Sequence, residues 1–241
     1  MTALVLKGLC KHYDLPGRHV AALAGVDLAV AAGSFVTLVG RSGCGKTTLL
    51  RIIAGLERPT AGEVVFNPPA ARVGMVFQEP RLMPWLTVAE NMALAMRRSE
   101  PDEIRQTVDR HLEMLGLSAF RAAYPAQLSG GMAQRVALGR ALCFSADIIL
   151  MDEPLSALDA FTRRSLQDEL VAILHRCGKT VIFVTHDIDE ALILGQRVLV
   201  MENGAISRDL AVPFPYPRDR TDEAFYRLRE SLLASLKGAT P

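Results

Sequence analysis

The sequence is poor in cysteine, and its cysteines show no paired spacing. The four residues stand far apart without a C-x-x-C pair: Cys10, Cys44, Cys143 and Cys177. A disulfide framework and a zinc cage both need closely spaced or paired cysteines, so neither is expected. We expect small buried thiols in a reducing cytosol.

The chain also lacks an excess of charge of either sign. Lys and Arg total 27 and Asp and Glu total 26, which leaves a formal net charge of +1. Binding to nucleic acid through counterion release requires a concentrated basic face. Nucleic acid is therefore not an expected partner, although a local basic patch is compatible with this balance.

No leader peptide or membrane span stands out. Residues 1–11 have no basic region ahead of a long apolar stretch, so no signal peptide is expected. Residues 21–40 carry one charge, Asp27, over about the length of a membrane span. A charge at mid-bilayer is costly, and Gly25 and Gly33 fit turns, so two short strands explain this segment better. We expect a soluble protein that can dock on a membrane protein.

Short apolar runs alternate with helical patterns, which is typical of an α/β fold with a largely parallel sheet. Continuous apolar runs predict strands buried on both faces at 35–39, 73–77, 148–151, 181–185 and 198–201. Two further segments, 4–9 and 24–30, favour an antiparallel β edge layer. Helices are expected at 46–54, 88–97, 102–115, 131–142, 161–176 and 188–194.

The domain boundaries follow from the same patterns. No convincing strand falls between 87 and 145, which predicts an all-helical subdomain inserted into a core formed by 1–86 and 146–212. Prolines at 213, 215 and 217 then predict a stiff linker. Thr221–Glu223 offers an N-cap and acidic first turn for a final helix, whose apolar face holds Phe225, Leu228, Leu232 and Leu236. The linker and this helix make up residues 213–241.

A glycine-rich segment follows the expected strand 35–39 and matches G-x-x-x-x-G-K-[ST]. Its backbone N–H groups and the start of the next helix are suited to binding phosphates. We expect a phosphate-binding loop made of Gly40, Arg41, Ser42, Gly43, Cys44, Gly45, Lys46, Thr47 and Thr48. Lys46 would reach the β- and γ-phosphates, Thr47 would ligate Mg²⁺ and Thr48 would donate to the α-phosphate. The alternative is a glycine-rich turn that matches by chance, which the flanking strand and helix disfavour.

Two carboxylates end the apolar strand at 148–151. Asp152 is placed to hold Mg²⁺ through water, as an acidic residue at the end of such a strand does. Glu153 would point toward the γ-phosphate and polarise or deprotonate the attacking water. The alternative is a strand that simply ends in solvated acids, and it is stronger for Glu153 than for Asp152.

A second anion-binding helix start is expected at 128–135. Ser129 is a candidate N-cap, and Gly130 and Gly131 leave the first N–H groups of the next helix uncovered. Because the phosphate loop already holds this chain's own nucleotide, the second site makes sense if it serves a nucleotide bound to another subunit.

With these motifs in order, nearly the whole chain resembles the ATP-binding subunits of ABC transporters. The resemblance implies a P-loop NTPase (RecA-like) core, ATP and Mg²⁺ as cofactors, and ATP hydrolysis. Residues 128–135 match the signature motif, with Met132 where the commonest form has Gln. Gln78 matches the glutamine that touches Mg²⁺ and the attacking water, and Asp159 matches the loop that crosses the dimer interface. His186 matches the residue that contacts the γ-phosphate, and Tyr13 the aromatic residue that stacks on adenine.

Taken singly, Tyr13, Gln78 and His186 would be an edge-strand tyrosine, a loop amide and a strand-end histidine. The family resemblance implies a head-to-tail dimer of two copies, each binding ATP between its own phosphate loop and the partner's signature motif. It also implies a membrane permease as partner, a separate substrate-binding protein acting indirectly, and a peripheral position at the cytoplasmic face of the inner membrane.

The subfamily is indicated by residues 77–88 and 217–220, which look like importers of nitrate, taurine and aliphatic sulfonates. Importers of thiamine precursors or polyamines share parts of this pattern and remain alternatives. An ABC ATPase acting on DNA or the ribosome is less favoured, since the chain has one motif set and no heptad run. An exporter is also less favoured, because exporters usually fuse this module to membrane helices. The apolar run 82–86 holds the only tryptophan, Trp85, and is expected to contact a partner.

Overall fold

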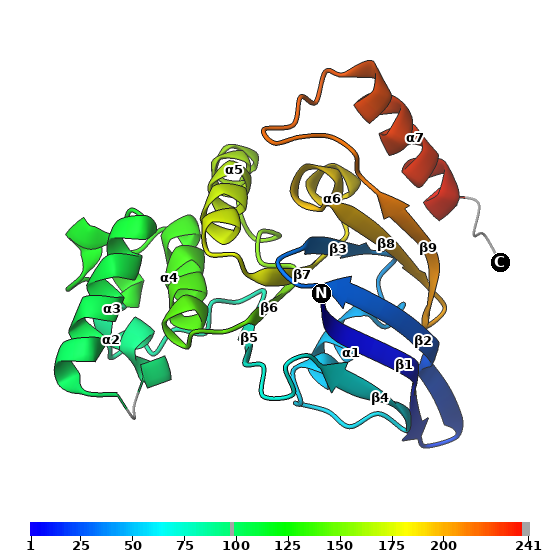
Figure 1. The fold of residues 1–241 in the computed structure, drawn as a ribbon, viewed down its shortest axis with the longest axis horizontal. Coiled ribbons are helices and arrows are strands. Elements are labelled where there is room, and N and C mark those ends of the chain that lie inside the picture. The colour runs from blue at the N-terminus through cyan, green and yellow to red at the C-terminus, as the bar shows by residue number, and fades with distance from the viewer. Residues whose placement is uncertain (97–98, 238–241) are drawn as a thin grey trace. The chain divides into compact units, whose positions relative to one another are not determined.

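A computed structural model describes residues 1–96 and 99–237 (Figure 1). The chain forms two compact units. The terminal unit combines Met1–Ala70 with Thr180–Pro241, and the middle unit is Ala71–Lys179. No helix in these described ranges is long and apolar enough to cross a membrane.

An antiparallel sheet of three strands opens the terminal unit, in the order β2 (Arg18–Ala31), β1 (Thr2–Leu15) and β4 (Ala61–Phe66). The register of β1 against β2 shifts between Leu6 and Leu9, around Gly8, whose φ is 54°. Such a bulge moves the following residues to the opposite face of a strand. Leu4, Leu6 and Leu9 are consequently all buried, although strict alternation would have turned Leu9 outward. The predicted edge layer is confirmed.

Parallel strands form the core of the terminal unit. β3 (Phe35–Val39) lies between β7 (Thr180–Thr185) and β8 (Arg197–Glu202), and β9 (Ala205–Ala211) pairs antiparallel with β8. Every residue of β3 and β7 is buried, as continuous apolar runs predict. The apolar stretch 21–40 thus contributes two strands, as expected.

The described residues of the terminal unit form the helices α1 (Lys46–Ile53), α6 (Ile188–Leu194) and α7 (Glu223–Lys237). Asp222 caps α7 by accepting from the N–H groups of Ala224 (2.7 Å) and Phe225 (3.2 Å). On the predicted apolar face, Phe225 and Leu232 are buried and Leu228 is half-buried. The side chain of Leu236 lies outside the described part of the chain.

The middle unit is mainly helical. Its two parallel strands are β5 (Val73–Val76) and β6 (Ile148–Asp152). Its α-helices are α2 (Val88–Ala93), α3 (Pro101–Met114), α4 (Gly130–Cys143) and α5 (Ala160–Arg176). Short 3₁₀ turns occur at η1 (Leu94–Met96), η2 (Ser118–Phe120) and η3 (Pro125–Gln127). The described residues between 87 and 145 contain no strand, and the predicted helix end at 97 falls outside them.

Close packing explains a glycine inside α4. A Cβ added at Gly139 would lie 2.6 Å from the Met92 methyl of α2 and 2.8 Å from a Leu115 methyl. These distances are far below normal van der Waals contact. The glycine therefore lets α2 and α4 approach each other, at the usual cost in helix propensity.

Candidate active site

The phosphate loop connects β3 to α1 in the terminal unit. Gly45 precedes the first residue of α1 and has a φ of 104°, a conformation that L side chains rarely adopt. A Cβ there would lie 2.2 Å from the Ala22 carbonyl oxygen, and one at Gly40 would lie 2.4 Å from that of Met201. Only glycine fits at these two positions, so the start of α1 stays uncovered.

Lys46 is 6% exposed and its ammonium group lies across this loop. Its Nζ donates to the carbonyl oxygens of Gly40 (2.8 Å) and Arg41 (3.0 Å). A cation held beside an uncovered helix N-terminus makes a site for anions, since the helix dipole and the lysine charge act in the same direction. The loop therefore fits the phosphates of a nucleotide.

A cavity of about 490 Å³ borders the loop. Residues 41–44 line it together with Ala21 and residues 201–204, which end β8 and form its turn to β9. This volume is in the range of small-molecule sites, roughly 300–1,000 Å³. Burial raises the pKa of the Cys44 thiol, which keeps it protonated at neutral pH and weakly nucleophilic.

Tyr13 lies beside the end of the phosphate loop. Its hydroxyl donates to Glu57 (2.6 Å) and also interacts with the Thr48 side chain. Burial is the main factor that raises the pKa of Tyr13, and its bond to Glu57 adds to the rise. The Lys11 ammonium lies 5.1 Å from the ring centroid. Two residues expected to bind the nucleotide, Tyr13 and Thr48, are thus neighbours.

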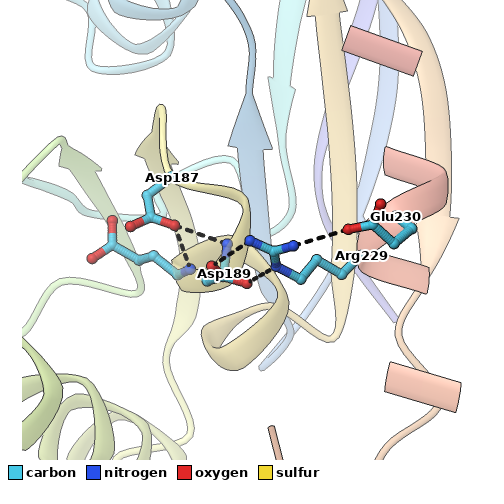
Figure 2. A network of polar contacts seen from close by, with 5 residues as sticks. Asp187, Asp189, Arg229 and Glu230 are labelled. Carbon is cyan, nitrogen blue, oxygen red and sulfur yellow. Dashed lines mark hydrogen bonds and ion pairs between the residues drawn. The ribbon is translucent and has the colours of Figure 1, made fainter. Parts of the chain in front are cut away.

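His186 leaves the sheet beside the same loop. Val39 is the register partner of Thr185 on the adjacent parallel strand, so Gly40 and His186 follow at the same sheet edge. A turn holds the His186 backbone: the Asp187 N–H donates to Thr185 Oγ1 (3.0 Å). Asp187 then caps α6 by accepting from the N–H groups of Asp189 (2.8 Å) and Glu190 (3.2 Å) (Figure 2).

The middle unit brings Gln78, Asp152 and Glu153 to the end of its strand pair. Val76 and Met151 are register partners, so the residues that follow them leave the same sheet edge. Glu153 has a φ of 46°, which is costly for a residue with a Cβ, about 1–3 kcal/mol. Its carbonyl oxygen accepts from Ser156 N (3.2 Å) and Ser156 Oγ (2.9 Å). Strained residues of this kind are concentrated at active sites.

Ser129 caps α4, as predicted, by accepting from the Met132 N–H (3.3 Å). The next two glycines have a packing role as well. A Cβ at Gly130 would lie 3.1 Å from Leu158, and one at Gly131 would lie 2.9 Å from Thr162. The signature segment therefore packs closely on the loop and helix that follow Glu153.

Asp159 caps the first turn of α5. Its Oδ1 accepts from the N–H groups of Phe161 (3.0 Å) and Thr162 (3.0 Å). Hydrogen bonds from Thr162 are the main factor that lowers the pKa of Asp159. The carboxylate consequently has a local structural role beside any role at a dimer interface.

Gln134 was not anticipated as a site residue. It is 5% exposed, and its Nε2 donates to the Gln78 carbonyl oxygen (2.6 Å). A polar side chain on the buried face of a helix could have flagged it, because buried amides require partners. The bond joins the signature helix to the segment that carries Gln78.

A strand–loop–helix that binds phosphates, together with a strand ending in two acids, defines a P-loop ATPase. Residues 23–156 match the family model described as ABC transporter, and the chain belongs to this family. It is an ATP-binding and ATP-hydrolysing subunit of the ABC type.

Relatives extend the match to nearly the full length. "Aliphatic sulfonates import ATP-binding protein SsuB 1" of Pseudomonas syringae pv. syringae is 49% identical, covering 95% of this chain and 94% of its own. A dimeric post-hydrolysis structure of the ATP-binding cassette MJ0796, bound to ADP and Pi, has a TM-score of 0.77 and 35% identity, covering 88% and 100%. CbiO1 of Clostridium perfringens, part of the ABC transporter complex CbiONQ, has a TM-score of 0.80 and 25% identity, covering 98% and 95%.

Proposed function

We propose that this chain powers an importer of small oxyanions such as aliphatic sulfonates, taurine or nitrate. The observation that carries the proposal is its 49% identity, over nearly both full lengths, to a protein named for sulfonate import. The resemblance of residues 77–88 and 217–220 to importers of this type agrees with it. Importers of thiamine precursors or polyamines are the alternative.

In this proposal the terminal unit binds the nucleotide. The N–H groups of residues 40–48 bind the phosphates, and Lys46 moves from its loop carbonyls to the β- and γ-phosphates. Tyr13 stacks on adenine through the ring face opposite Lys11. His186, at the sheet edge where the loop begins, contacts the γ-phosphate.

Thr47, Asp152 and Gln78 would hold Mg²⁺ in this proposal. These ligands are oxygen donors, which Mg²⁺ prefers, and it usually binds through one or two carboxylates together with phosphates and water. When bound, Mg²⁺ neutralises charge on the phosphates. Glu153 accepts a proton from the attacking water, and its strained backbone fixes where the carboxylate points.

The proposed working form is a head-to-tail dimer of two copies. Ser129, Gly130 and Gly131 then close over the γ-phosphate bound to the partner, and Asp159 lies at the interface. The MJ0796 cassette, whose dimer holds ADP and Pi, supports this arrangement. The CbiO1 relative, described as part of a transporter complex, supports a permease as the other partner. The chain would lie peripherally at the cytoplasmic face of the inner membrane, with a substrate-binding protein supplying solute to the permease.

The substrate class can be tested with the assembled transporter in proteoliposomes. ATP hydrolysis should rise several-fold with an alkanesulfonate, taurine or nitrate when the matching binding protein is present. Spermidine and a thiamine precursor serve as controls and should leave the rate at its basal value. Stimulation by a control solute alone would contradict the oxyanion assignment while leaving the ATPase assignment intact.

Residues 82–86 are the proposed docking site for the permease. Buried Asn91 holds this segment: its Oδ1 accepts from Met83 N (2.8 Å), and its Nδ2 donates to the carbonyl oxygens of Met83 (3.1 Å) and Leu86 (3.0 Å). Trp85 is 70% exposed on this fixed loop. A large aromatic side chain displayed on a rigid surface is a frequent centre of protein–protein contacts.

We therefore expect Trp85→Asp to abolish co-purification with the permease and solute-stimulated hydrolysis. Basal ATPase and melting temperature should stay near wild type, because an exposed side chain contributes little to the core. Phe120→Asp, which alters another exposed aromatic residue of the same unit, is the matched control and should retain the permease. Loss of basal activity in Trp85→Asp would show that this segment belongs to the core.

A further inference from the structure

The C-terminal segment 212–237, here called the strap, forms hydrogen bonds with both ends of α6. At the C-terminal end, Arg218 donates through Nη1 to the carbonyl oxygens of Gly195 (2.6 Å) and Leu192. The Tyr216 hydroxyl donates to the Leu194 carbonyl oxygen. The Arg218 guanidinium also stacks on the Tyr216 ring, 4.3 Å from its centroid. The strap thus binds carbonyl groups that the end of a helix leaves without intrahelical partners.

At the N-terminal end of α6, Arg229 of α7 binds Asp189 through two hydrogen bonds. The distances are 2.5 Å from Nε to Oδ1 and 3.2 Å from Nη2 to Oδ2 (Figure 2). Arg229 also donates through Nη1 to Glu230 (3.0 Å). A two-point contact between guanidinium and carboxylate fixes orientation as well as distance.

Apolar contacts keep the strap in place. Val212, Phe225 and Leu232 are 5%, 2% and 0% exposed, and the Phe214 and Phe225 rings lie 5.7 Å apart. The strap is therefore packed against the rest of the terminal unit along much of its length. Arg229 is presented to α6 from a fixed helix.

The turn that Arg229 holds is also the turn that follows His186. Asp187 caps α6 through the Asp189 and Glu190 N–H groups, while its own N–H is bound by Thr185. Asp189 is therefore held at two points. Its backbone N–H donates to Asp187, and its side-chain carboxylate accepts from Arg229. A shift of the first turn of α6 would move the His186 backbone with it.

We propose that Arg229 is a positioning residue for His186 and that the strap thereby supports ATP hydrolysis. The proposal rests on the proposed contact of His186 with the γ-phosphate. It adds a contribution from the C-terminal helix, which lies outside the nucleotide-binding motifs. Nucleotide binding by the phosphate loop should be independent of this contact.

The test compares Arg229→Ala with Arg227→Ala, which removes the same charge from the same helix. Arg227 pairs with Glu223 at 2.5 Å, one turn earlier on the same helix, so this ion pair lies within α7. We expect Arg229→Ala to lower kcat about tenfold, less than the roughly 10²-fold cost of a 1 Å misplacement. The KM for ATP and mant-ATP binding should be unchanged. Arg229→Lys, which keeps the charge, should recover part of kcat.

The melting temperatures of both variants are measured as well. If the Arg229–Asp189 ion pair only stabilised the fold, its loss would lower activity by unfolding the protein. Arg229 and Asp189 are 32% and 42% exposed, and ion pairs at such exposure contribute little to stability. The melting temperature of Arg229→Ala should therefore equal that of Arg227→Ala. If Arg229→Ala does not fold, Asp189→Asn decides by the same comparison of kcat and KM.

His186→Ala separates the two proposals. If it loses hydrolysis while Arg229→Ala matches Arg227→Ala in kcat, the positioning role is wrong and the role of His186 stands. If His186→Ala hydrolyses ATP at the wild-type rate, both are wrong. Loss of hydrolysis in His186→Ala together with a selective fall of kcat in Arg229→Ala supports both.

Discussion

Replacing Glu153 by glutamine is expected to lower ATP turnover by roughly 10²- to 10⁴-fold, the usual contribution of a general base. Glutamine has nearly the same size and shape as glutamate, but its amide cannot accept a proton from water. Mg·ATP should still bind, because the phosphate loop is formed by residues 40–48 and does not include Glu153. The uncleaved γ-phosphate would then join Lys46 of one copy to Ser129 of the other and hold the dimer together.

Size-exclusion chromatography with and without ATP checks this expectation. The Glu153→Gln protein should elute as a dimer only with ATP. Glu63→Gln is a matched control, since Glu63 is an exposed acid that pairs with Lys7 on the edge sheet. A Glu153→Gln protein that stays monomeric in ATP and keeps wild-type turnover would exclude Glu153 as the base.

The second large effect concerns the ATP sites of the proposed dimer. Each site is formed by the phosphate loop of one copy and the signature motif of the other. Ser129→Arg should block the γ-phosphate position of the partner, and Lys46→Ala should disable the chain's own loop. Each variant alone is expected to lose nearly all hydrolysis. Mixed in ATP, the two proteins can form one site from two intact halves, so part of the activity should return.

Ser129→Ala is the control for the lost helix cap, which costs about 1 kcal/mol. Because Ser129 is exposed, an arginine there can extend without disturbing the core. Nucleotide binding is measured on Ser129→Arg by itself. If this variant cannot bind ATP, Ser129 serves its own chain's nucleotide and the head-to-tail arrangement is wrong.

The features that could be predicted from the sequence are those with a local pattern. The loop at 40–48, the cap at Ser129 and the buried parallel strands each follow from neighbouring residues. β4 and β9 were not predicted because they are edge strands whose mostly exposed residues lack an apolar run. The same reasoning explains why β1 and β2 extend beyond their apolar centres: pairing between strands continues where burial has ended.

The features that could not be predicted depend on contacts between distant segments. The hydrogen bond from Gln134 to Gln78 and the ion pair between Arg229 and Asp189 join residues that are far apart in the sequence. The left-handed backbone of Glu153 has no signature in composition either. In the proposals above each of these features would act on catalysis, whereas the motifs predict only which residues take part.

The hydrogen bond between Gln134 and the Gln78 backbone has a consequence for cooperativity. In the proposed dimer, Gln78 serves the ATP bound to its own chain, whereas Ser129, which caps the helix that carries Gln134, serves the ATP of the partner. A hydrogen bond of 2.6 Å thus joins the segment that carries Gln78 to the helix that begins after Ser129. Occupancy of either site would then change the affinity of the second by the same factor, and ATP binding would show a Hill coefficient that differs from one.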